Sequence, residues 1–206
     1  MGEVILDAIL GLALILVAMI LHELAHGMAA YWLGDMTAKE NGRLTLNPLK
    51  HLDPMMSLVL PGLLYIMGMP VLGGAKPVPV DSRNLKGGVW GMALVALAGP
   101  LMNFLLIFVG FLGYRFLGQG EIWVSFAWIN LSLMIFNLIP IPPLDGSRVL
   151  YALAPDGVRN FLVNFERYGI LVIYLLIFLG GSSVLTQMLN GAMSGLWQFF
   201  VFIIGG

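Results

Sequence analysis

Cysteine is absent from this chain, and charged residues are scarce. Its 206 residues include 10 Lys and Arg and 11 Asp and Glu, or 10% of the sequence, whereas a soluble domain carries about a quarter. The lack of cysteine excludes a disulfide framework, a thiolate metal site and a thiol nucleophile. A net charge of −1 argues against a nucleic acid as partner. Hydrophobic residues make up 59% of the chain, with a mean hydropathy of +0.93, which indicates an integral protein of the lipid bilayer.

Long apolar runs predict that the chain crosses the membrane several times. As a helix, Val4–Leu33 would be about 45 Å long, more than the roughly 30 Å of a hydrocarbon core. Because no basic segment or clear cleavage site precedes it, we expect a retained helix rather than a signal peptide. The expected fold class is an all-α polytopic membrane protein with five to six transmembrane helices in a single domain, 1–206. The further spans are Trp90–Leu112, Ile122–Ile139 and Phe161–Leu179, whereas Ser182–Ile204, the weakest candidate, could span or could lie on the membrane surface.

Two polar stretches, residues 35–53 and 73–89, carry three basic side chains each, whereas residues 113–121 carry one. The positive-inside rule places both basic stretches in the cytoplasm. The short apolar segment 54–72 between them, which Pro61-Gly62 interrupts, would then be re-entrant; the alternative is an ordinary span with one basic loop outside. Within the polar stretches, the alternation of Gly42–Leu46 and the prolines of Ala75–Val80 predict short β-like strands.

The first apolar helix contains the motif His22-Glu23-Leu24-Ala25-His26. A spacing of four residues places both imidazoles on one face of a helix, where they can bind one metal ion. Glu23 can reach a water molecule on that metal without ligating it. Imidazole suits zinc, and catalytic zinc sites keep one position open for water. A lone histidine in an apolar helix is usually a hydrogen-bonded core residue, but ionisable groups clustered at membrane depth indicate a functional site.

A catalytic zinc ion needs a third protein ligand, and Asp145 is the strongest candidate. It follows the Pro-rich turn at residues 140–143, which would fix its direction, and it begins or caps a short helix, Gly146–Leu153. In the predicted topology Asp145 emerges on the cytoplasmic side, as His22 and His26 do. Its alternative role is only to cap that helix. The other candidates for the third ligand are Glu40, His51, Asp53, Asp81 and Asp156.

These motifs resemble those of the site-2 protease family of intramembrane zinc metalloproteases. The resemblance covers about residues 15–155 and joins the His22–His26 motif to Asn137-Leu-Ile-Pro-Ile-Pro-Pro-Leu-Asp145-Gly146. It implies one Zn²⁺ ion per chain, held by His22, His26 and Asp145, with Glu23 as the catalytic carboxylate. The catalytic core would then lie at about residues 4–155, followed by C-terminal helices at 158–206.

Other stretches resemble the compact subgroup of that family, which has no PDZ or CBS-type domain. They are residues 42–54 and 75–80, and Gly99-Pro100 with Asn103 is similar to a feature of the family's core helix. The resemblance implies that the substrates are membrane proteins, cleaved in or near their transmembrane segments. We expect a bacterial or archaeal cell membrane, with the active site toward the cytoplasm.

In such a hydrolysis Glu23 would take a proton from the attacking water and later deliver it to the leaving amine. The developing oxyanion needs a further donor. Asn137 is preferred for its place in the Asp145 motif, although its amide could instead join two helices. Asn103 is expected to be structural, and His51 to belong to a gate or substrate loop. The extended segments 44–46 and 75–80 would either clamp an unwound substrate beside the ion or merely cover the site.

Two other functions stay open from the sequence. A membrane metal-ion transporter would also place His and carboxylate side chains within the bilayer. It would be expected to show internal symmetry between its halves, which the sequence lacks, and it would not need Glu23 beside His22. A catalytically inactive homologue would not need the intact motif together with Asp145. The sequence gives no indication of the oligomeric state.

Overall fold

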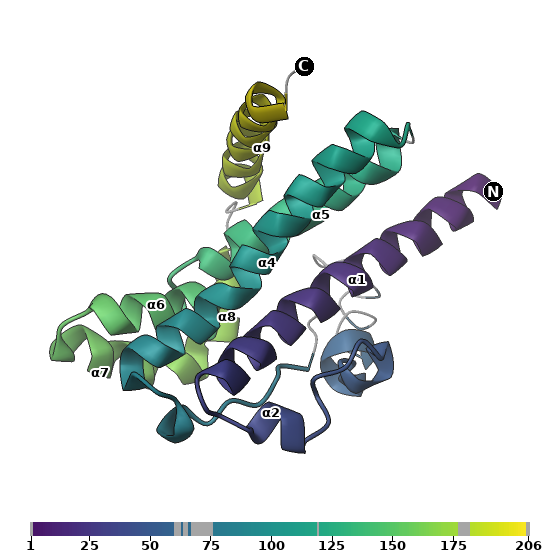
Figure 1. Ribbon diagram of the computed structural model, residues 1–206. Coiled ribbons are helices and arrows are strands. Elements are labelled where there is room, and N and C mark those ends of the chain that lie inside the picture. Colours follow the sequence, from purple (N-terminus) through teal and green to yellow (C-terminus); the bar gives the residue numbers. More distant parts are fainter. Residues whose placement is uncertain are drawn as a thin grey trace.

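Three long apolar helices form the body of the molecule. The computed structural model describes residues 2–59, 63, 66, 76–118, 120–176 and 182–204. Helices α1 (Gly2–Trp32), α4 (Gly88–Phe116) and α5 (Gly120–Leu138) have the length and hydropathy that a membrane span requires. Helix α4 packs against both α1 and α5, and Figure 1 shows the three running side by side. These helices match three of the predicted spans to within a few residues.

The remaining helices lie around this body. Helix α9 (Ser182–Ile204) packs against α5 and α4 along the half of the molecule that holds the C-terminus (Figure 1). The short elements are α2 (Thr37–Glu40), η1 (Pro48–Lys50), η2 (Pro54–Val59), η3 (Ser82–Asn84), α6 (Asp145–Leu153), α7 (Asp156–Phe165), η4 (Glu166–Tyr168) and α8 (Gly169–Leu176). Of these, α6 packs against α4, and it follows α5 after a tight turn.

The C-terminal spans and the re-entrant segment agree less well with the prediction. Instead of one helix at 161–179, the structure has α7 and α8 joined by the short 3-10 helix η4, and residues 177–181 lie outside the described part. Helix α9 covers the predicted range 182–204, but it is not among the helices that have spanning length and hydropathy. The structure thus supports three of the five to six spans. Most of the segment 54–72 also lies outside the described residues, which leaves its re-entry a prediction.

The strand predicted at 42–46 is wrong, and no strand is found elsewhere in the part of the chain that the structure describes. Residues 42–46 form a turn and bends, because Gly42 adopts a left-handed conformation with φ +62° and no neighbouring strand pairs with the segment. Residues 76–80, which Pro77 and Pro79 keep extended, have no partner strand, and the N–H of Lys76 donates to the carbonyl of His51 over 2.8 Å. Arg43 donates to the carbonyl of Lys76 over 2.5 Å, and the N–H of Val78 donates to a side chain of α1.

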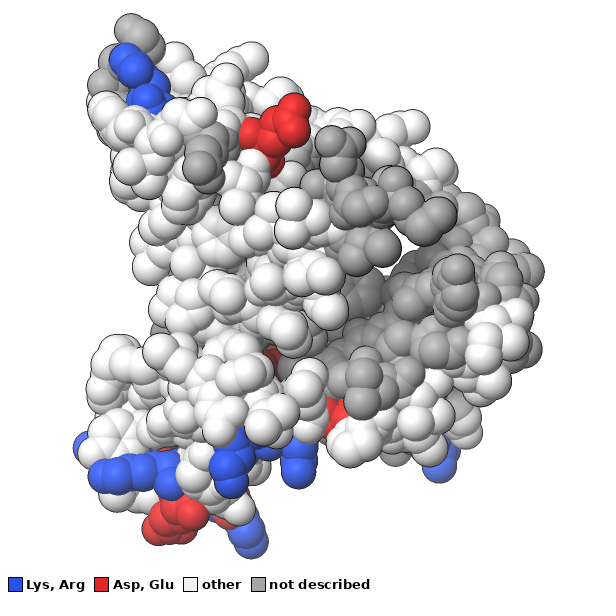
Figure 2. Space-filling model, turned by 90° about the vertical axis from the view of Figure 1, so that its right-hand side faces the viewer, with Lys and Arg blue, Asp and Glu red and all other residues white. Residues whose placement is uncertain are grey.

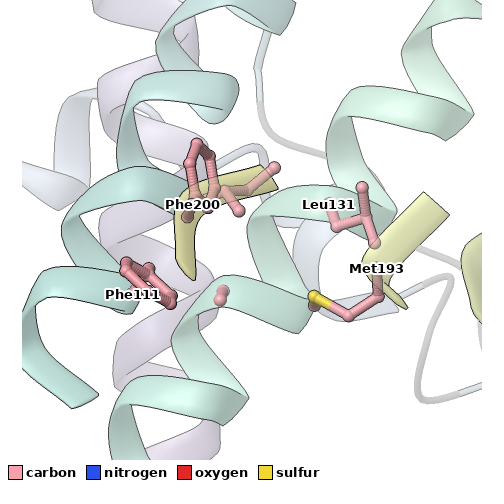
Figure 3. Packing of buried hydrophobic residues seen from close by; sticks show 6 residues of the cluster. Phe111, Leu131, Met193 and Phe200 are labelled. Carbon is pink, nitrogen blue, oxygen red and sulfur yellow. The ribbon is translucent and has the colours of Figure 1, made fainter. Parts of the chain in front are cut away.

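An apolar cluster joins α4, α5 and α9. We call these six buried residues the apolar cluster: Ile107, Phe111, Ala127, Leu131, Met193 and Phe200. Figure 3 shows Phe111 and Leu131 on α4 and α5 beside Met193 and Phe200 of α9. The ring centroids of Phe111 and Phe200 lie 5.5 Å apart, within the range of favourable aromatic pairs. Close packing of this kind holds helices together where lipid tails provide no hydrophobic driving force.

Candidate metal centre

The structure brings together His22, His26 and Asp145 from two distant parts of the chain. The Nε2 atoms of the two histidines lie 3.0 Å apart, and Asp145 Oδ2 lies 3.3 Å from each of them. The two histidines are 6% and 8% exposed. Within the described residues this is the group of His, Asp and Glu side chains whose ligand atoms converge as a metal ion requires.

The distances between the three atoms fit one zinc ion. Ligands that lie 2.0–2.1 Å from a tetrahedral zinc are about 3.3 Å from one another, close to the 3.0 and 3.3 Å found here. Asp145 Oδ2 is buried and accepts no hydrogen bond from the described residues. A buried carboxylate oxygen without a donor is costly unless a cation lies beside it. The donor set and its geometry therefore fit the metal that the motif predicts.

Helix α4 orients both imidazoles from behind. His26 Nδ1 lies 2.7 Å from the carbonyl oxygen of Val95, which can only accept, so this nitrogen carries the hydrogen and Nε2 presents a lone pair. His22 Nδ1 lies 2.5 Å from Oδ1 of Asn103. Metal-binding histidines commonly donate their second nitrogen to such oxygens, which fixes the ring and its tautomer. Sequence reasoning missed Val95, because a backbone carbonyl leaves no trace in the sequence, and it assigned Asn103 a merely structural part.

Gly99 allows α4 to approach the two histidines. A Cβ atom added at this position would overlap His26 Nε2 and lie 2.6 Å from His22 Cε1. Any larger residue would therefore displace the imidazoles from the centre. The close approach gives a physical reason for Gly99, which the sequence marked only through a resemblance.

Asp145 is directed at the centre by the start of α6. The tight turn before it is closed by the N–H of Leu144 donating to the carbonyl of Ile141 over 2.9 Å. Leu144 is the N-cap of α6, and no side chain caps the helix, so Asp145 is not its cap. The carboxyl group of Asp145 must be an anion to bind a metal ion, and a cation beside its Oδ2 favours that form.

Glu23 lies beside the centre without belonging to the ligand group. Its Oε2 accepts a hydrogen bond of 2.9 Å from the N–H of Val78. Because Pro77 and Pro79 have no N–H, Val78 is the donor of this short stretch. The contact holds the extended segment 76–80 against α1 and fixes one oxygen of Glu23. Sequence reasoning placed this segment near the site but did not predict the contact.

The other predicted residues do not meet at the centre in the described structure. The Asn137 side chain donates to the carbonyl of Leu133, one turn earlier in its own helix, over 2.9 Å. His51 is buried and its Nε2 lies 2.7 Å from the carbonyl of Thr45, so it organises a loop rather than the ligand group. The further candidates for the third ligand, which lie outside the converging group, are Glu40, Asp53, Asp81 and Asp156.

Comparison with known proteins decides the family. The sequence profile described as peptidase family M50 matches residues 114–181. The chain is 39% identical over 201 residues to "Putative zinc metalloprotease YwhC" of Bacillus subtilis (strain 168). The matching region covers 90% of this chain and 88% of that protein. The chain belongs to peptidase family M50. "Putative zinc metalloprotease Rip2" of Mycobacterium tuberculosis (strain ATCC 25618 / H37Rv) is 33% identical over 192 residues, 89% of this chain and 70% of that protein.

Membership of family M50, the site-2 protease family, confirms the resemblance found from the sequence. This M50 peptidase is a zinc metalloprotease, and Zn²⁺ is its metal. Its apolar helices make it an integral membrane protein. No solved structure matches the chain.

Proposed function

We propose that this M50 peptidase is an intramembrane endopeptidase that cleaves membrane proteins in or near their transmembrane segments. The observation that carries the proposal is the position of the ligand group. His22 and His26 lie within Ile9–Trp32, a stretch with spanning length and hydropathy, and Asp145 meets them there. A metal centre that is enclosed by apolar helices favours a substrate that is itself in the membrane.

In this proposal Glu23 is the general base. A bound zinc ion is a Lewis acid that polarises a peptide carbonyl and makes water a nucleophile at neutral pH. Among the described contacts only Oε2 of Glu23 is engaged, by Val78. Its Oε1 can therefore accept a proton from the attacking water and return it to the leaving amine.

Asn137 is proposed as the donor that stabilises the developing oxyanion. It lies at the end of α5, eight residues before Asp145 in the chain. Its amide now donates to Leu133, so it must exchange this bond for one to the substrate.

A substrate must present an extended backbone, because a helix hides its carbonyls in hydrogen bonds. In the segment 76–80 the N–H groups of Lys76 and Val78 donate to the carbonyl of His51 and to Glu23, so the edge on which they lie is closed to a substrate. The opposite edge has no N–H group at Pro77 or Pro79, and the carbonyl of Pro77 accepts from Arg43. We propose that an unwound peptide lies along residues 44–46, or against this opposite edge as a donor of hydrogen bonds.

We propose that the active site opens toward the cytoplasm of a bacterial or archaeal cell. On the face drawn in Figure 2, most Lys and Arg side chains gather at one end of the molecule. Nine of the ten basic residues belong to the segments 35–53, 73–89 and 148–167, and Arg115 alone lies near the α4–α5 turn. The positive-inside rule assigns the basic end to the cytoplasm.

The test is cleavage of a model transmembrane peptide by the purified protein with zinc. Glu23→Gln removes the base but keeps a polar side chain, so we expect cleavage to stop while zinc stays bound. Glu40→Gln, the same change at an exposed carboxylate of α2, is the matched control and should cleave as the wild type does. Cleavage by Glu23→Gln at the wild-type rate would contradict the proposed role of Glu23. Undiminished zinc binding by Asp145→Ala would contradict the ligand assignment.

A further inference from the structure

Two asparagines are buried between the apolar helices behind His22. Asn103 on α4 and Asn130 on α5 are both 0% exposed. Asn103 Nδ2 donates to Asn130 Oδ1 over 2.9 Å, and Asn130 Nδ2 donates to the carbonyl oxygen of Phe126 over 2.9 Å. On its other side, Asn103 Oδ1 lies 2.5 Å from His22 Nδ1. Polar side chains at membrane depth are costly, which raises the question of what this pair does.

The hydrogen bonds of this chain can run in only one direction. The carbonyl of Phe126 has no hydrogen to give, so Asn130 must turn its NH2 group toward it and its oxygen toward Asn103. Asn103 must then turn its NH2 group toward Asn130 and its oxygen toward His22. An isolated amide could turn over and exchange its two ends, but the backbone carbonyl at the far end removes that freedom.

The consequence reaches the metal centre. Because Asn103 offers His22 only an acceptor, the hydrogen of the neutral imidazole is held on Nδ1 and Nε2 keeps a free lone pair. This Nε2 is the atom that faces His26 and Asp145. His26 obtains the same tautomer directly from the carbonyl of Val95, whereas His22 depends on two side chains.

We propose that Asn103 and Asn130 are positioning residues that relay the polarity of the Phe126 carbonyl to His22 and so fix the tautomer that binds zinc. The proposal rests on His22 being a zinc ligand. The competing explanation is that the two amides only join α4 to α5, as buried polar side chains often do between membrane helices. The two explanations differ in what Asn130 does to zinc affinity, because Asn130 has no contact with His22 among the described hydrogen bonds.

The experiment measures the affinity of the zinc-free full chain for zinc alone, by competition with a chromophoric chelator. In Asn103→Leu, His22 loses its acceptor, and we expect zinc affinity to fall about 10- to 100-fold. In Asn130→Leu, Asn103 is free to turn its NH2 group toward His22, so affinity should fall by about 10-fold although His22 is untouched. Ser132→Ala is the matched control. Its hydroxyl also donates to a carbonyl of α5, that of Trp128, and its loss should leave zinc affinity unchanged.

Aspartate at either position separates the relay from a structural role. Asn103→Asp still offers His22 an acceptor, and Asn130→Asp still offers one to Asn103, so both should bind zinc within a few-fold of the wild type. A purely structural role predicts the opposite, because a buried carboxylate disturbs the helix pair more than leucine does. Thermal unfolding of each zinc-free variant shows that it is folded. If a leucine variant does not fold, the aspartate variants decide alone.

Wild-type zinc affinity in Asn130→Leu, or a more than 10-fold loss in Asn103→Asp, would overturn the relay. His22→Ala keeps this result apart from the ligand assignment on which it rests. Weak zinc binding by His22→Ala beside tight binding by Asn130→Leu refutes the relay alone. Tight binding by His22→Ala refutes the assignment of His22 and the relay with it.

Discussion

One face of α4 packs against polar side chains at one end and against apolar side chains at the other. Gly99, Asn103, Ile107 and Phe111 follow one another at steps of four residues and so lie along one stripe of the helix. At the first two positions the neighbours are the histidines of α1 and the buried amide of Asn130. At the last two they are the apolar side chains of α5 and α9. The same helix is therefore held by directed hydrogen bonds at one end of the stripe and by packing at the other.

The two ends should respond differently to substitution. Apolar packing tolerates changes that conserve volume, because dispersion contacts have no direction. In the polar end each donor has one acceptor, so a single change leaves buried groups unpaired. We therefore expect changes in the apolar cluster to alter stability, and changes at the polar end to alter zinc binding first.

The largest difference is expected from adding one methyl group at each end of the stripe. In Gly99→Ala the new Cβ would occupy the space of the two imidazoles, so zinc binding should be lost altogether. Gly110→Ala adds the same group three turns later, 3.0 Å from Ala127 Cβ and from the carbonyl oxygen of Trp123, where a shift of α5 by a few tenths of an ångström relieves the contact. The zinc content of the purified variants measures the difference.

Gly110→Ala is also the control for the general effect of alanine in this helix. It should keep one zinc ion per chain even if its thermal unfolding changes. Stoichiometric zinc in Gly99→Ala would show that the imidazoles can move aside and still ligate, and the distinction between the two ends would fail.

The sequence predicts well those features that depend on one stretch of the chain, such as the long helices and the metal-binding motifs. The spacing of His22 and His26 follows from the helical repeat alone, and the long apolar runs locate α1, α4 and α5. Asp145 was found by its Pro-rich turn and its distant partner motif. In each case the information lies within one short stretch of the chain or in one recognisable pattern.

The contacts between segments far apart in the chain could not be predicted. Which carbonyl of α4 faces His26, and that the N–H of Val78 reaches Glu23, depend on how segments far apart in the chain meet. The strand predicted at 42–46 was wrong for a related reason. Its alternating pattern suits a strand only where another strand is present to pair with it, and Arg43 instead donates its hydrogen bonds to residues 76 and 77.

The second prediction concerns the apolar cluster. Leu131 is fully buried, so Leu131→Ala should leave a cavity and lower the free energy of unfolding by about 2 to 3 kcal/mol. We choose the low end of the usual range because helices in a bilayer lose packing but little transfer free energy. Equilibrium unfolding in a detergent or bicelle measures it, and zinc affinity of the folded protein should not change.

Leu131→Met conserves the volume and serves as the matched control, with an expected loss below about 1.5 kcal/mol. A change of zinc affinity in Leu131→Ala as large as its change of stability would show that the cluster and the metal centre are one unit. The comparison drawn from α4 would then have to be given up.

The smallest effect is expected at Asp35, which lies outside the spanning helices. There a charged side chain joins two segments through buried hydrogen bonds, as the neutral amides do within the spanning helices. Asp35 is fully buried and accepts hydrogen bonds from Thr37 Oγ1 and the N–H groups of Thr37 and Asp81, so it joins the end of α1 to the segment after Val80. Burial raises the pKa of Asp35, but these hydrogen bonds and the one from Asn84 together lower it by more, so that it lies below its ordinary value.

A carboxyl whose pKa is lower in the folded state stabilises the fold fully above its ordinary pKa of about 3.9. This contribution is lost as the pH falls through the lower pKa of the folded state. The stability difference between wild type and Asp35→Asn should therefore be constant near neutral pH and shrink below about pH 4, as unfolding curves can measure. Asp156→Asn, at an exposed carboxyl of α7, should show no such difference. A difference independent of pH down to pH 2 would mean that Asp35 acts through shape rather than charge. In that case the buried carboxylate of Asp35 would act as the neutral amides of Asn103 and Asn130 do, through the fit of its hydrogen bonds alone.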